Sequence, residues 1–106
     1  MMITDVIAEA RTEHEIYFLL TAYLESVRFG DKFGLLPEHV TKLPVSGLAD
    51  VKRRFDDLRM ERDQALFQSN DRSRMFISEA LSVVGTARDR LTWLARPESR
   101  YPGQAN

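Results

Sequence analysis

The two histidines are the side chains in this sequence that are best suited to metal binding or general acid–base catalysis. His14 lies between Glu13 and Glu15. On a helix those carboxylates project about 100° to either side of the imidazole, so the three groups cannot hold one ligand. His39 follows Glu38 in a separate segment, and a metal site would need both histidines to converge. We therefore expect His14 to be a partly buried, hydrogen-bonded residue inside the fold, and the sequence predicts no metal site.

Other catalytic motifs are missing from the sequence. There is no cysteine, which removes thiol nucleophiles, disulfides and zinc sites built on thiolates. The glycines, at positions 30, 34, 47, 85 and 103, match neither the dinucleotide-binding nor the P-loop spacing. The sequence therefore predicts a protein without a cofactor that is not an enzyme.

A basic cluster, Lys52-Arg53-Arg54 followed by Arg59, could contact phosphate groups. The whole chain, however, has 15 basic and 16 acidic side chains and a formal net charge of −1. Nucleic-acid-binding proteins usually have a clear basic excess or a basic face. We expect a solvated face of mixed charge, and a nucleic-acid-binding regulator that uses arginines of the second and third predicted helices remains an alternative. The acidic neighbours of the cluster are Asp50, Asp56, Asp57, Glu61 and Asp63.

The most apolar stretch is residues 16–24, in which only Thr21 is polar. It lies in a predicted helix over residues 4–29, which Gly30 ends. One apolar face of this helix starts at Ile3 and continues to Leu24, and we expect the other helices to cover it. A second face needs the following connection or another subunit to cover it, and consists of Ile16, Leu19, Leu20, Tyr23 and Val27.

Residues 30–45 contain two glycines and two prolines together with six large apolar side chains. This composition predicts an ordered strap with one helical turn from Pro37 to Thr41. Long ordered connections can be functional. A helical enzyme or small-ligand binder with a pocket under the strap is therefore a further alternative, and its walls would be Tyr23, Phe33, Leu36 and His39.

A second predicted helix begins at Ser46, a favourable N-cap residue. Its apolar seam is interrupted by Arg62. We expect the stem of Arg62 to pack inside and its guanidinium to reach a carboxylate of the first helix, so that Arg62 and His14 are the internal polar residues. Asp50 and Arg54 form one of four i,i+4 ion pairs on the charged surface of this helix, where each pair contributes about 0.3 kcal/mol.

Turn and capping residues at 69–71 separate this helix from a third one, predicted over residues 72–95. A single rod through both helices is the alternative, but a bend lets both apolar faces meet the first helix. Gly85 is expected off the apolar face of the third helix.

Four large apolar side chains lie off the main faces of these two helices. Met75 and Trp93 share one line of the third helix, and Met60 and Phe67 lie off the seam of the second. Either the tail covers Trp93 or these residues face another chain. The group indicates more apolar surface than a monomer needs.

These elements predict an all-α fold, a three-helix up-down-up bundle with the ordered strap between the first two helices, which dimerisation could complete as a larger bundle. Residues 1–96 are expected to form one domain and residues 97–106 a loose tail. The sequence has no basic signal peptide and no run of about 20 apolar residues, so we expect a soluble, cytoplasmic protein with no membrane partner.

The leading functional hypothesis is a non-enzymatic protein–protein interaction module that forms a homodimer or binds another helical protein. Its basis is surplus apolar surface on a chain without catalytic residues. No small-molecule ligand follows from the sequence. The candidate interface residues are Ile16, Leu19, Leu20, Tyr23, Val27, Met75 and Trp93.

Overall fold

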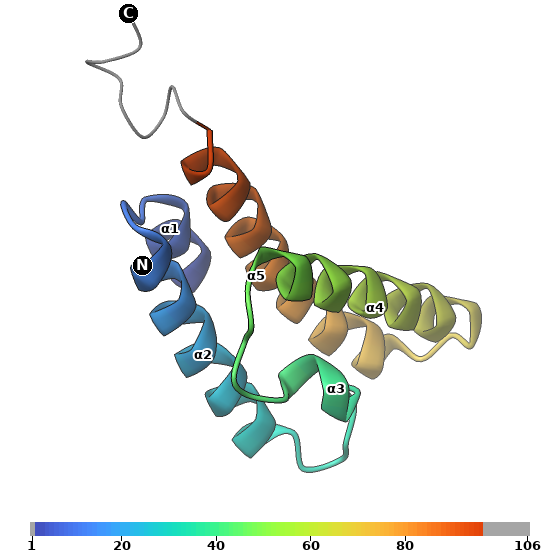
Figure 1. Cartoon of the computed structure of the whole chain (residues 1–106). Helices are drawn as coiled ribbons and strands as arrows, with labels where there is room; N and C mark the ends of the chain where they lie inside the picture. The colour runs from blue at the N-terminus through green and yellow to red at the C-terminus, as the bar shows by residue number, and fades with distance from the viewer. Residues whose placement is uncertain (1, 97–106) are drawn as a thin grey trace, which may run out of the picture.

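The computed structural model describes residues 2–96, and within that range the chain forms helices and loops but no strand (Figure 1). The all-α prediction is therefore confirmed, whereas the predicted tail at 97–106 lies outside the described residues. The helices are α1 (Ile3–Ala8), α2 (Glu13–Gly30), α3 (Glu38–Thr41), α4 (Leu48–Phe67) and α5 (Asp71–Leu94).

The first predicted helix is two helices, so the prediction of one continuous helix over residues 4–29 is wrong. Thr12 caps α2, because its Oγ1 accepts a hydrogen bond from the Glu15 N–H at 3.1 Å. The Glu15 carboxylate in turn accepts from the Arg11 N–H at 3.3 Å. These two hydrogen bonds start a new helix at Glu13, much as a capping box does. From α5, Arg90 Nε donates to the Ala10 carbonyl at 2.7 Å and holds the break in place.

This break changes which face of α2 is buried. The predicted first face was traced through Ile3 as if one helix continued to Leu24, but the kink resets the helical phase at Glu13. The buried line of α2 is instead Ile16, Leu20 and Leu24, at steps of four residues. It takes residues from both predicted faces.

The helices α4 and α5 form an antiparallel hairpin, so the single-rod alternative is wrong and the predicted turn is confirmed (Figure 1). Asn70 caps α5, since its Oδ1 accepts from the Ser73 N–H at 3.2 Å. Ser69, just before it, has a φ of 57°, a left-handed conformation that is typical of a helix end.

α5 is the central element, because it packs against α4 and also against α1 and α2 (Figure 1). Burial of each large aliphatic side chain against it contributes roughly 1.5–3 kcal/mol relative to exposure. The fully buried large side chains come from all five helices: Ile7, Ile16, Leu20, Leu24, Val40, Val51, Leu58, Ile77, Val83, Val84 and Leu91.

Gly85 is buried in the α4–α5 contact, which corrects its predicted place off the apolar face. A Cβ at this position would lie 2.8 Å from Cε1 of Phe55. The other helix therefore brings an aromatic ring to a distance that only glycine accommodates without a shift. The guanidinium of Arg88 also lies 4.0 Å from the centre of the Phe55 ring.

The strap is ordered and connects the end of α2 to the start of α4. Pro37 precedes α3, so the predicted helical turn is confirmed and begins one residue later than expected. The Asp31 carboxylate accepts from the backbone N–H groups of Leu35 at 2.7 Å and Leu36 at 2.8 Å. With Val40 fully buried, the short α3 packs against both α2 and α4 (Figure 1).

Candidate functional site

Asp50 and Arg54 form a buried ion pair at the start of α4, with only 5% and 4% of each residue exposed. Arg54 Nη2 lies 2.9 Å from Asp50 Oδ2. The same guanidinium donates to two strap carbonyls, from Nη1 to Val40 at 2.8 Å and from Nη2 to Pro44 at 3.3 Å. Arg54 therefore ties the strap to α4.

Asp50 is held by three donors. Besides Arg54, Arg53 Nη2 lies 2.6 Å from Oδ1, and the Ser46 N–H donates to Oδ2 at 2.9 Å. Burial raises the pKa of Asp50, but the hydrogen bonds and charges of these donors outweigh it and lower the pKa to about 2. The prediction that the Ser46 side chain caps this helix is wrong: Gly47 is the N-cap residue, and Ser46 instead donates its backbone N–H to the Asp50 side chain.

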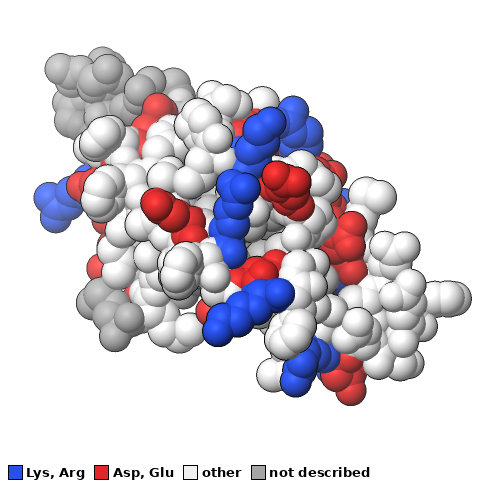
Figure 2. Space-filling view, turned by 90° about the horizontal axis from the view of Figure 1, so that it is seen from below, with Lys and Arg blue, Asp and Glu red and all other residues white. Residues whose placement is uncertain are grey.

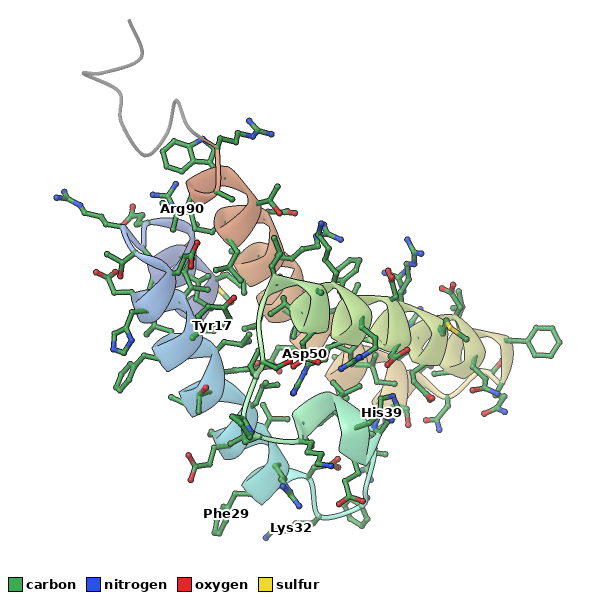
Figure 3. All side chains as sticks on the ribbon, viewed as in Figure 1. Tyr17, Phe29, Lys32, His39, Asp50 and Arg90 are labelled. Atoms are coloured by element: carbon green, nitrogen blue, oxygen red, sulfur yellow. The ribbon has the colours of Figure 1, made fainter. Side chains whose placement is uncertain are left out.

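A pocket of about 410 Å³ opens beside this pair, between the strap and α4. His39 on α3 closes one side, with its Nε2 3.1 Å from Asp57 Oδ2 on α4. Figure 3 shows Asp50 and His39 on these two neighbouring elements. We call this site the strap pocket, and it is lined by His39, Lys42, Leu43, Pro44, Ser46, Asp50, Arg53, Arg54 and Asp57.

Four residues were predicted to line a pocket under the strap, and of these His39 alone lines the strap pocket. Phe33 is exposed, with the guanidinium of Arg72 5.7 Å from its ring centre, and Leu36 is in the core. Tyr23 is half-buried on α2, where burial and then the charge of Glu79 raise the pKa of its hydroxyl. The strap pocket is therefore more polar than predicted.

The two predicted internal polar residues are not internal. His14 is exposed because the new helix start at Glu13 places it in the first turn of α2, away from the buried line. Arg62 is partly exposed, and its nearest carboxylate is Asp63 at 3.5 Å rather than one of the first helix. Beyond its first turns α4 extends away from α1 and α2, which puts those carboxylates out of reach (Figure 1).

The residues that are internal, Asp50 and Arg54, were predicted to be a surface pair. Their sequence signal is an i,i+4 spacing that three other pairs on the same helix share. Of the four predicted pairs only this one forms within the described residues, where the strap supplies the carbonyls of Val40 and Pro44 and Ser46 supplies its N–H.

The candidate interface residues divide into core and surface. Ile16 and Leu20 are fully buried by the chain itself, which corrects their assignment to an interface. Met75 and Trp93 are exposed, by 71% and 41%, and the Arg90 guanidinium lies 4.3 Å from the centre of the Trp93 ring. The other three are half-buried against the core, namely Leu19, Tyr23 and Val27.

Several large apolar side chains remain exposed, in two places above all. In the outer half of the α4–α5 hairpin are four of them, on the outward sides of both helices, which we call the hairpin-tip cluster: Met60, Leu66, Phe67 and Met75. On the outer face of α2 are Phe18 and Phe29, and Figure 3 shows Phe29 projecting away from the helices. The predicted exposure of Met60, Phe67 and Met75 is therefore confirmed.

Charges of both signs lie next to one another on the face shown in Figure 2, without a continuous basic surface there. Within residues 2–96 no group of three or more metal-ligating side chains is close enough to hold an ion. In the same range no helix is long and apolar enough to cross a membrane. No protein-family model, curated protein or solved structure shows a significant match to this chain.

Proposed function

We propose that this protein is a non-enzymatic interaction module that pairs with a second copy of itself through the hairpin-tip cluster, and that this pairing completes a larger helical bundle. The observation that carries the proposal is the exposure of the cluster, in which Phe67 is 91% and Met75 71% exposed. Several large apolar side chains left exposed at one end of a molecule are typical of protein–protein contacts.

The charges around the cluster support a copy of the same chain as the partner. Residues 59–75 contain four arginines and three acidic side chains, a net charge of 4 − 3 = +1. In a two-fold contact the same patch meets itself, so a strongly charged patch would repel its copy and a nearly balanced one does not. This balance favours self-association over a partner of strongly opposite charge.

Light scattering on a size-exclusion column, over a range of concentrations, tests the proposal. We expect the mass to rise with concentration from 12.2 kDa towards twice that value. The double variant Phe67→Glu/Met75→Glu should remain monomeric, because it places two charges in each half of the contact. The matched variant Phe18→Glu/Phe29→Glu, which changes the outer face of α2, should still dimerise.

A wild-type mass that stays at one chain up to hundreds of micromolar would refute self-association. If Phe18→Glu/Phe29→Glu dissociated the dimer and the hairpin-tip variant did not, the contact would lie on α2 instead.

A further inference from the structure

The strap pocket has the charge and the donors of an anion site. Lys42, Arg53 and Arg54 face Asp50 and Asp57 in its lining, a net charge of 3 − 2 = +1 with His39 neutral. Both carboxylates are already engaged, Asp50 by the two arginines and the Ser46 N–H, and Asp57 by His39. The excess positive charge in the lining is therefore available to a ligand.

Two of the cations have donors to offer. Lys42 is exposed and has no ion-pair partner within residues 2–96. Arg53 has one nitrogen fixed by Asp50 at 2.6 Å, while its side chain stays 70% exposed at the pocket. An arginine that is already oriented loses less conformational freedom when it binds an oxyanion.

The third cation has an unused donor inside the protein. Arg54 is almost fully buried, and its Nε–H has no hydrogen-bond acceptor, although both terminal nitrogens are paired. A buried polar group without a partner is uncommon in folded proteins and calls for an explanation. Because that nitrogen is enclosed by the protein, Arg54 contributes its positive charge to the lining rather than a donor to a ligand.

We infer that the strap pocket binds a small ligand through an oxyanion, a phosphate or carboxylate group, with Lys42 and Arg53 as its donors and Arg54 adding positive charge to the lining. A pocket of about 410 Å³ is much larger than the oxyanion itself and lies in the range of small-molecule sites. The ligand therefore has a compact apolar part as well, which Leu43 and Pro44 would contact. This inference is independent of self-association at the hairpin tip.

Thermal unfolding at constant ionic strength tests this inference with phenyl phosphate and benzoate as probes and chloride as the reference. A ligand that binds only the folded state raises the Tm in a saturable way. We expect saturation with at least one probe, and the probe that saturates identifies the oxyanion. Inorganic phosphate should bind more weakly than phenyl phosphate if the apolar part contributes.

Two lysine variants separate the pocket from general charge effects. Lys42→Gln should weaken binding about tenfold or more, because it removes a charged donor. Lys52→Gln removes an exposed lysine of α4 that does not line the pocket, and should bind as wild type does. Both changes are at exposed positions, and the Tm without ligand checks that each variant is folded.

The inference is overturned by either of two results. One is the absence of saturation with both probes in the wild-type protein. The other is equal binding by Lys42→Gln and Lys52→Gln, which would show that the shift comes from charge screening.

Discussion

The two ends of α4 differ in which side chains they bury: charged side chains are buried at its start, and an apolar side chain is exposed at its end. At its start, Asp50 and Arg54 are buried and paired, whereas in its last turn Phe67 is 91% exposed. The strap returns to the first end and supplies the carbonyls of Val40 and Pro44 as acceptors for the buried guanidinium. At the second end the strap brings Phe33 near Arg72 of α5, but the described residues leave Phe67 uncovered. Side-chain type alone therefore does not decide burial, because the neighbouring segment must supply either hydrogen bonds or cover.

Because their surroundings differ, the two candidate sites also differ in the kind of partner they favour. At the strap end, fixed donors and a cavity favour a small polar ligand. At the hairpin tip, exposed large apolar side chains favour another protein chain. The two proposed sites thus lie at opposite ends of α4, about 20 residues apart along that helix.

The largest expected effect comes from removing the buried cation. Arg54→Met should lower the free energy of unfolding by about 3–5 kcal/mol, because Asp50 stays buried without its main partner and two strap carbonyls lose their donor. Urea unfolding measures this loss. Arg59→Met, which removes the exposed pair of Arg59 with Asp56 at 3.8 Å, should cost less than about 0.5 kcal/mol. Similar costs for both variants would remove the distinction between the two ends.

Acid titration isolates the carboxylate of the same pair. Because the folded-state pKa of Asp50 is lowered from 3.8 to about 2, its ionised form stabilises the fold above pH 4. That stabilisation, about 2 kcal/mol, should be lost as the pH falls from about 4 to 2. The stability difference between wild type and Asp50→Asn, measured by urea unfolding at each pH, should shrink by this amount. A difference that does not depend on pH would contradict the lowered pKa.

At the hairpin tip, the strongest polar contribution should come from the cap of α5. Asn70→Ala removes the acceptor for the Ser73 N–H and should cost about 1 kcal/mol. Gln64→Ala, at an exposed position of α4, is the control and should be neutral or slightly stabilising. If Asn70→Ala lowered the unfolding free energy as much as Arg54→Met, polar contacts at the tip would contribute as much stability as those at the strap end.

The smallest effect is expected at the most exposed aromatic residue. Phe67→Gln should change the unfolding free energy by less than about 0.5 kcal/mol at low protein concentration, where self-association adds nothing. Leu58→Ala, at a fully buried position of the same helix, should lower the unfolding free energy by about 2–5 kcal/mol. A cost above about 1 kcal/mol for Phe67→Gln would mean that another part of the chain covers the tip.

Local signals predicted much of the fold. The turn at 69–71, the single turn after Pro37 and the helix end near Gly30 all follow from residues within a few positions of each boundary. The start of α2 also has a local signal, the Thr12 and Glu15 pair, but the continuous apolar pattern around it favoured an unbroken helix. In this protein the capping pair, and not the apolar pattern, sets where the helix begins.

The candidate sites were predicted less well, for a physical reason. His14 and Arg62 were selected because each lies within an apolar line. The line of His14 shifted once the first helix divided, whereas Arg62 lies where α4 has extended away from α1 and α2. Asp50 and Arg54 share their i,i+4 spacing with three other predicted pairs of α4 that do not form within the described residues. Their burial depends on backbone acceptors that lie 10 to 14 residues from Arg54 along the chain.

By itself, the sequence determined the helical class, the positions of most helix ends and the surplus of apolar side chains at Met60, Phe67 and Met75. Capping groups, glycine, proline and helical periodicity act over a few residues, so a linear pattern contains them. The tertiary structure decided which face of α2 is buried and which ion pair enters the interior. Those outcomes depend on where the strap and α5 lie in space, because burying a charge requires acceptors and counter-charges that only distant segments supply.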